Sequence, residues 1–234
     1  MAARQQWSLH ARLVDELGRR VVADPELTLS PDEIGAEFGV SRTVVRETLR
    51  VLEAKGLVSA RPNVGTRVRP RTDWNLFDPQ VIDWRLHGPR RAEQMRELLE
   101  LRGGIEPMAA ALAAERATPA DVTALREAWS GMRDAVAAHD LSAFSAADIA
   151  LHTALLAAVD NPMIAQLSGV VAEVVRAREE MLRRPEHINP DAVARHGDLV
   201  EAVAGHDPAA ASSAMRAVLA EVTHAVTTSA PDRR

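Results

Sequence analysis

Three side chains of types that bind metals or organic anions are predicted to point into a helical core. The stretch DIALHTALL, residues 148–156, places Asp148 and His152 four residues apart, and residues at that spacing share one face of a helix. Apolar residues in and beside this stretch point in nearly the same direction on a helical wheel: Phe144, Leu151, Leu155 and Val159. His196 is also predicted to face inward, because apolar residues flank it: Val193, Leu199, Val200 and Val203.

One aspartate with two histidines is a common ligand set for a divalent metal. Burying a charge without partners is costly, so these side chains must have partners inside the protein. Two interpretations remain open, a metal or polar-ligand site and a satisfied hydrogen-bonded network. No HExxH motif and no Ser/His/Asp arrangement is present, so the sequence does not indicate catalysis. The remaining histidines are predicted to be solvated: His10, His87, His139, His187, His206 and His224.

A second set of residues has the spacing of a DNA-reading helix. Arg42, Arg46 and Arg50 recur every four residues and form one stripe. The other side of this helix is mostly apolar, with Val44, Val45, Leu49, Val51 and Leu52 beside Thr48. Arginine at such positions can bind guanine edges in the major groove or clamp phosphates.

The elements around this helix fit the same interpretation. Ser41 and Thr43 lie at the start of the helix, where backbone N–H groups and the helix dipole favour phosphate. A predicted hairpin follows, with a turn at RPNVG and with Arg61, Arg67 and Arg69 as wing charges. The alternative is an amphipathic surface helix with an exposed arginine row. The order of short helix, glycine turn, capped helix and hairpin favours a winged helix-turn-helix.

The periodicity predicts a mainly α protein with two domains. Helices are expected at 9–23, 31–38 and 41–54, and beyond the hairpin at 79–87, 90–116, 119–138, 140–158, 162–183, 190–204 and 207–228. We expect a winged helix-turn-helix domain with a small β-hairpin wing over 1–72. A linker with a connecting helix follows over 73–88, and an antiparallel all-α bundle for effector binding and dimerisation covers 89–230.

Composition and charge restrict the class of protein. Residues 1–72 hold 12 basic and 9 acidic residues, whereas residues 73–234 hold 16 and 24. The basic excess is concentrated in residues 42–71, which is typical of a surface that binds a polyanion. Cysteine is absent, and no apolar run approaches the roughly 20 residues of a membrane span. With no signal peptide pattern either, the sequence predicts a cytoplasmic protein.

Residues 38–68, FGVSRTVVRETLRVLEAKGLVSARPNVGTRV, resemble the DNA-binding domain of the GntR family of bacterial transcription regulators. The resemblance implies that Arg42, Thr43 and Arg46 face the operator and that the wing around Gly65 enters the minor groove. The predicted DNA-binding set is Ser41, Arg42, Thr43, Arg46, Arg50, Arg61, Asn63, Gly65 and Thr66. Two positions differ from the family pattern. Asp32 stands where a basic residue is frequent, and Asn63 replaces the first wing glycine. Because asparagine tolerates the left-handed conformation, we expect the turn to be kept.

Residues 95–224 resemble the all-helical effector domain of the FadR-type subfamily, through three segments: ELRGGIEPMAAALAAERAT, DIALHTALLAAVDNP and RHGDLVEAVAGHDPAAASSAMRAVL. The resemblance implies a divalent metal such as Zn²⁺ on Asp148, His152 and His196. A further histidine would fall at Val218, so either three ligands with water hold the ion or an organic acid binds directly. The resemblance also implies that Arg102 binds an effector carboxylate, and its alternative is a helix salt bridge to Glu106.

These observations predict a DNA-binding transcription regulator, a repressor by family habit, that responds to a small carboxylate metabolite. WNLFDPQVIDW, residues 74–84, is similar to subfamily members that respond to sugar acids. We expect a homodimer on a near-palindromic operator, with no membrane partner and no enzyme activity. The alternatives are a metal-dependent enzyme with a nucleic-acid-binding appendage and a purely architectural DNA-binding protein.

Overall fold

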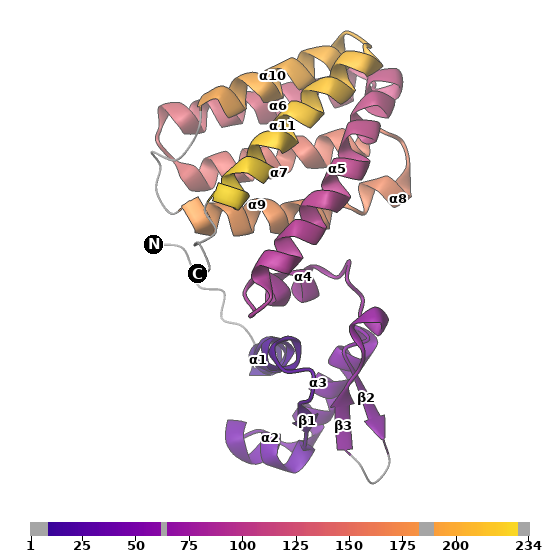
Figure 1. Cartoon of the computed structure of the whole chain (residues 1–234), viewed down its shortest axis with the longest axis vertical. Coiled ribbons are helices and arrows are strands. Elements are labelled where there is room, and N and C mark those ends of the chain that lie inside the picture. The colour runs from indigo at the N-terminus through magenta and orange to yellow at the C-terminus, as the bar shows by residue number, and fades with distance from the viewer. Residues whose placement is uncertain (1–8, 62–64, 183–189, 229–234) are drawn as a thin grey trace. The chain divides into compact units, whose positions relative to one another are not determined.

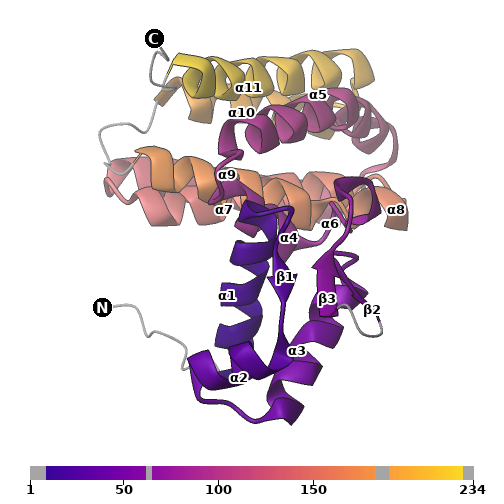
Figure 2. The same cartoon turned by 60° about the horizontal axis from the view of Figure 1, so that its bottom comes forward.

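The computed structural model describes residues 9–61, 65–182 and 190–228, with the backbone alone for residues 61, 181–182, 190 and 221–228. The chain divides into two compact units, residues 1–94 and 95–234, and the boundary falls inside helix α5 (Arg91–Arg116). Helices dominate both units, and the described strands all lie in the first unit (Figures 1 and 2). The predicted fold class, a winged helix domain followed by an all-helical domain, is confirmed.

The first unit is built around three helices and a small sheet. Its elements are α1 (Leu9–Ala23), β1 (Thr28–Leu29), α2 (Pro31–Phe38), α3 (Arg42–Ala54), β2 (Val58–Arg61), β3 (Gly65–Val68), the 3-10 helix η1 (Arg71–Asp73) and α4 (Pro79–Leu86). Ser30 caps α2, and Gly39 ends it in the left-handed conformation that glycine adopts easily. The core is formed by side chains such as Leu17, Leu52 and Trp84, each no more than 1% exposed.

The sheet of this unit has three strands where the sequence predicted two. The strand order is β1-β3-β2, with both pairs antiparallel and with Ser59 opposite Arg67. The added strand, β1, is only two residues long and pairs Leu29 with Thr66. Two residues are too few to show an alternating pattern, so this strand carried no sequence signal.

The second unit is all-helical in its described residues. After α5 come α6 (Pro119–Ala137), α7 (Leu141–Ala157), α8 (Pro162–Ala165), α9 (Ser168–Leu182), α10 (Pro190–Ala204) and α11 (Pro208–Thr228). Helix α7 packs against both α6 and α9, and α10 packs against α6 and α11. Thr118 and Asp121 form a capping box at the start of α6, and Asp140 caps α7. This packing brings α7 and α10 close enough to share a core.

The helix predicted over 162–183 is two helices in the structure. The chain makes i→i+3 hydrogen bonds between them, from Leu167 N to Ile164 O and from Val170 N to Leu167 O, both at 3.0 Å. Ile164 is buried and Leu167 packs against the same core, so the tighter turn brings both side chains inward. A helical wheel cannot register such a break, because the apolar period continues on either side of it.

Candidate functional site

The outward face of α3 carries the predicted DNA-reading arginines. The helix begins after Ser41, whose Oγ accepts a hydrogen bond from Val44 N at 3.4 Å. Three inward residues anchor the helix in the core and are fully buried: Val45, Thr48 and Leu52. The predicted arginine stripe is solvent-exposed on the opposite side, at Arg42, Arg46 and Arg50.

These arginines line a groove of about 640 Å³ between α3 and the wing. Thr43 and Thr66 line it as well, although Thr66 is only 5% exposed in β3. Gly65 has φ +91°, a value that favours glycine and turns the chain into β3. The predicted wing residue Asn63 and the side chain of Arg61 lie outside the described part of the structure.

Two of the three arginines on α3 are held by acidic neighbours. Arg42 Nε lies 3.0 Å from Asp32 Oδ1 on α2, and Arg50 Nη1 lies 2.9 Å from Glu47 Oε1 one turn earlier. Arg46 has no ion-pair partner among the residues that the structure describes. Arg46 is therefore the guanidinium of the stripe that is available without breaking an existing ion pair.

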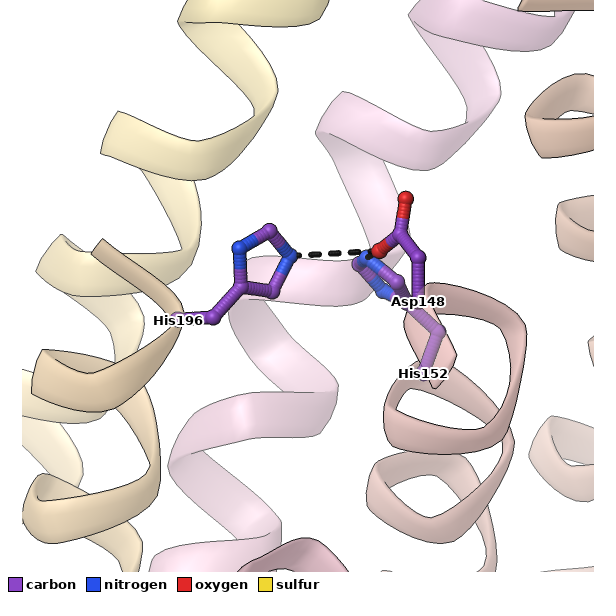
Figure 3. A group of neighbouring side chains, drawn as sticks. All are labelled: Asp148, His152 and His196. Carbon is purple, nitrogen blue, oxygen red and sulfur yellow. Dashed lines mark ion pairs between the residues drawn. The ribbon is translucent and has the colours of Figure 1, made fainter. Parts of the chain in front are cut away.

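The second candidate site is the cluster that joins α7 to α10. Asp148, His152 and His196 are each at most 3% exposed, and their side chains point toward one another (Figure 3). Asp148 Oδ1 lies 3.3 Å from the Nε2 atoms of both histidines. One ligand atom from each residue falls within 4.8 Å of the others. The structure thus brings together the three residues that the sequence selected.

The other ring nitrogens fix how the two imidazoles are oriented. His196 Nδ1 donates to the backbone oxygen of Ala192 at 2.7 Å, so its Nε2 is the lone-pair atom of the neutral ring. His152 Nδ1 lies 2.7 Å from Glu106 Oε2 in a buried ion-pair contact. Both Nε2 atoms therefore face the space beside Asp148. Carboxylate or carbonyl partners of this kind are typical behind metal-binding histidines.

Two arginines border the cluster. Arg102 is 3% exposed and forms an ion pair with Glu106, while its Nη2 lies 3.4 Å from His152 Nε2. The salt bridge considered as an alternative role for Arg102 is therefore present, and the same side chain also faces the cluster. Arg178 on α9 places Nη1 3.9 Å from Asp148 Oδ2, and its buried Nε lacks a hydrogen-bond partner among the described atoms.

The charges of this cluster shift several pKa values. Burial alone would lower the pKa of His152, but the charge of Glu106 and the close contact with the Asp148 carboxylate raise it to about 9. Burial would raise the pKa of Glu106, yet Arg102 and His152 lower it to about 2. The histidines similarly outweigh burial at Asp148 and hold its pKa well below the usual value. The two carboxylates are therefore ionised at neutral pH.

The cavity among these side chains is small and matches an ion better than an organic molecule. Its volume is about 10 Å³, which is room for about one water. Zinc ligands at about 2.0–2.2 Å from the ion give tetrahedral edges of about 3.4 Å, close to the two 3.3 Å separations. Asp148 Oδ1 and His196 Nε2 lack well-aligned hydrogen-bond partners among the described residues. These residues fit a divalent metal, and Val218 lines the cavity where a further ligand was expected.

Sequence reasoning missed one residue of the site and undervalued another. Arg178 was not selected, although a wheel of α9 places it with Val174 and Val175, which line the same cavity. Glu106 was considered only as a partner of Arg102, and its contact with His152 joins residues 46 positions apart. The expected solvation of His10 holds only in part, because the residue is half-buried and its Nε2 has no hydrogen-bond partner in the described structure.

The other histidines whose side chains the structure describes do not join the cluster. His87, His139 and His206 are exposed, as predicted. His206 Nδ1 contacts the backbone oxygen of Ala114 at 2.8 Å. His187 and the side chain of His224 lie outside the described residues.

Both halves of the chain match known protein families. Residues 10–68 match the model of bacterial regulatory proteins of the gntR family, and residues 97–221 match the FCD domain. The galactonate operon transcriptional repressor of Escherichia coli K12 is 33% identical over 217 residues, 91% of this chain and 94% of that protein. A probable D-xylose utilization operon transcriptional repressor of Paenarthrobacter nicotinovorans is 27% identical over 78% of this chain and 72% of that one.

A solved structure has the same fold. The structure of Lar, which controls expression of the Listeria monocytogenes agr system, superposes with a TM-score of 0.67 at 19% identity and covers 96% of this chain and 99% of its own. None of the described helices combines the length and hydropathy that crossing a membrane requires. The chain belongs to the GntR family of bacterial regulatory proteins, in the FadR-type subfamily with a C-terminal FCD domain, and is a DNA-binding transcription regulator rather than an enzyme.

Proposed function

We propose that this regulator represses transcription until a small carboxylate metabolite binds its helical domain, with sugar acids as the first candidates. The observation that carries the proposal is the buried set of Asp148, His152 and His196, whose potential ligand atoms lie within 4.8 Å of one another. The relatives support the sugar-acid class, since one is named as a repressor of a galactonate operon. A protein that only bends DNA would leave this buried Asp/His set unexplained.

The arginines beside the cavity supply the recognition chemistry. Arg178 carries a buried guanidinium with an unpartnered Nε among the described atoms, and Arg102 Nη2 faces the same cavity. A guanidinium donates two parallel hydrogen bonds to a carboxylate, which gives both orientation and energy. Of the two, Arg178 has more donor capacity left, because Arg102 already pairs with Glu106.

The same residues would hold a divalent metal. Asp148 Oδ1 and the Nε2 atoms of His152 and His196 are the candidate ligands. A bound ion supplies positive charge that attracts carboxylate and hydroxyl oxygens. Glu106 and Asp148 are already opposed by Arg102 and Arg178, so a divalent cation would leave a net positive site, and an anionic effector would then bind more favourably.

Binding of a sugar acid requires the helices around the cavity to separate. The present space accepts about one water, whereas a sugar acid has more than ten heavy atoms. Because the walls come from α5, α7, α9, α10 and α11, opening the cavity rearranges the helical domain. An effector that binds only the open form shifts the equilibrium toward that form.

We propose residues 1–72 as the DNA-binding domain, 73–88 as the connection and 89–230 as the effector and dimerisation domain. In this arrangement a cytoplasmic homodimer places two α3 helices on the half-sites of a near-palindromic operator. Protein two-fold symmetry then matches the symmetry of the DNA. Effector binding lowers operator affinity by changing the spacing of the two DNA-binding domains.

The test combines ligand-dependent melting with operator release. The purified chain is melted with galactonate, gluconate or lactate, each with and without a chelator, and with D-xylose as an uncharged sugar. An operator is selected from random DNA duplexes and used in gel-shift titrations with the same compounds. We expect a carboxylate to raise the melting temperature and to weaken operator binding, and neutral xylose to do neither.

Matched variants assign the effect to the cavity. Arg178→Gln should abolish the response to the acid, whereas Arg176→Gln, two residues away and 55% exposed, should retain it. Stabilisation that survives the chelator indicates direct binding of the acid, and stabilisation lost with the chelator indicates that the metal takes part. If no carboxylate stabilises the protein or releases DNA, the proposed effector class is wrong.

A further inference from the structure

A second cavity, lined by arginines, lies in the first unit away from the groove beside α3. Its volume is about 410 Å³, within the range of small-molecule sites, which run from about 300 to 1,000 Å³. Its walls come from the end of α1 and the segment after it, the end of β3 and the segment after it, α4 and the residue before α5. All lining residues belong to residues 1–94. This cavity is distinct from the buried Asp148 cluster in the second unit.

The lining is rich in guanidinium groups. Arg69, Arg71, Arg85 and Arg90 line the cavity, and Glu26 is the acidic residue among its lining. Arg85 is 5% exposed, so a buried cationic side chain forms part of the wall. Arginine donates hydrogen bonds and accepts none, so this lining matches a ligand with carboxylate or phosphate oxygens.

The ion pairs at the rim are of a kind that a ligand can replace. Arg69 Nη2 lies 2.9 Å from Asp73 Oδ2, with both side chains 38% exposed. Arg71 Nη1 lies 2.8 Å from Glu93 Oε1, and the same carboxylate is 3.8 Å from Arg90 Nη1. Exposed pairs of this type contribute only about 0–1 kcal/mol each. An anionic ligand can therefore exchange with them at small cost.

The remaining walls are apolar and fixed. Trp74 is 9% exposed and its Nε1 donates a hydrogen bond to the backbone oxygen of Arg69 at 2.9 Å, which holds the indole in place. Val22, Val68 and Pro70 also line the cavity. Apolar walls with a few convergent charged groups are the usual composition of a site for a small organic ligand.

We propose that this cavity binds a small organic anion, with its carboxylate or phosphate group on the arginines and its apolar body against Trp74. The walls include the base of β3 and the segment that follows it. A ligand there contacts the chain directly behind the wing and stabilises one arrangement of the wing base. This second site is independent of the effector proposed for the helical domain.

Calorimetric titration of the full chain with simple probes tests the proposal. Phenyl phosphate and benzoate carry the two candidate anionic groups on the same apolar ring, inorganic phosphate carries the anion alone, and benzyl alcohol carries the ring alone. We expect saturable binding of one aryl anion per chain, weaker binding of inorganic phosphate and none of benzyl alcohol. Tighter binding of phenyl phosphate assigns the ligand to phosphates, and tighter binding of benzoate assigns it to carboxylates.

Three variants locate the binding site. The double variant Arg71→Gln/Arg90→Gln should lower aryl-anion affinity at least tenfold. Arg96→Gln is the matched control, because Arg96 is 61% exposed against 67% for Arg90 and does not line the cavity. Arg102→Gln should leave this binding unchanged, since Arg102 belongs to the buried cluster of the second unit. Thermal melts check that each variant is folded.

The outcomes separate this cavity from the alternatives. Binding that is lost in Arg102→Gln and kept in the double variant would belong to the helical domain and would overturn the proposal. Equal affinities for the double variant and Arg96→Gln, or no aryl-anion binding at millimolar concentration, would also overturn it. If the double variant loses operator affinity and the wild type binds no aryl anion, the arginines contact DNA phosphates instead.

Discussion

Replacing Arg46 with alanine should weaken operator binding more than the same change at Arg42 or Arg50. The three side chains lie on one exposed stripe of α3, but only Arg46 is without an ion pair among the described residues. Arg42 and Arg50 are held at 3.0 Å and 2.9 Å by Asp32 and Glu47. A DNA contact by either of these two arginines must first exchange its protein partner.

The magnitude follows from the two competing interactions. A bidentate arginine contact to a base contributes about 1–3 kcal/mol, so Arg46→Ala should raise the Kd by about 5- to 150-fold per bound chain. An exposed ion pair contributes up to about 1 kcal/mol. The increase in Kd caused by Arg42→Ala or Arg50→Ala should therefore be smaller than that caused by Arg46→Ala, by up to about fivefold. Asp32→Asn releases Arg42 and removes a negative charge beside the DNA, so it should tighten binding.

The assay is a gel-shift or fluorescence-anisotropy titration of each variant on the selected operator at several salt concentrations. Circular dichroism melts should coincide for all variants, because these side chains are exposed. Loss of a phosphate contact lowers the salt slope by about one, whereas loss of a base contact relaxes sequence preference. A Kd for Arg46→Ala within twofold of the wild type, or below that of Arg42→Ala, would contradict a dominant DNA contact by Arg46.

Three further predictions concern the cavity lined by Val218, the packing of Gly18 against Trp84 in the first unit and the N-terminal cap of α6. Val218→His adds an imidazole to the cavity wall and should slow metal loss to chelator, measured by mass spectrometry of bound metal; equal loss rates in variant and wild type would contradict the metal site. Gly18→Ala places a methyl carbon 2.4 Å from the Trp84 ring and should lower the free energy of unfolding, measured by urea denaturation, by about 1–3 kcal/mol. Gly103→Ala is the control and should not lower it, because the added methyl meets no atom within 4 Å. Hydrogen bonds from Thr118 lower the pKa of Asp121 in the folded state, so the ionised carboxylate stabilises the fold fully above about pH 4. This stabilisation is lost as the pH falls through the lower folded-state pKa. Asp121→Asn should therefore weaken the fall of unfolding free energy with decreasing pH, and an unchanged acid dependence would exclude this role.

The sequence predicted the helices well where a cap and a clear apolar period coincide. The predicted starts of α2 and α6 agree with the structure, where Ser30 and Thr118 accept hydrogen bonds from free N–H groups of the first turn. Pro31 and Pro119 follow these caps at a position where a missing N–H is tolerated. The two-residue strand β1 and the break at Leu167 carry no periodic signal, since pairing and packing with distant residues create them.

The candidate site was predictable in part, because helical periodicity shows which side chains face inward. Wheels of two separate helices showed that Asp148, His152 and His196 face inward, and the structure places them together. A wheel gives a direction and not a partner, so the contact of Glu106 with His152 could not be derived. The ion pairs that distinguish Arg46 from its neighbours likewise depend on side-chain positions that no spacing rule supplies.

If the acid proposed above binds at the cavity around Asp148, the tight closure of this cavity sets how fast it can enter. With space for about one water, an incoming acid waits for the surrounding helices to part. Its observed association rate then levels off at the opening rate instead of rising in proportion to concentration, and helix rearrangements of this type take microseconds to seconds. The same closure retains a captured molecule, so the response to its removal is delayed. A regulator built in this way averages over brief fluctuations in metabolite supply and follows sustained changes.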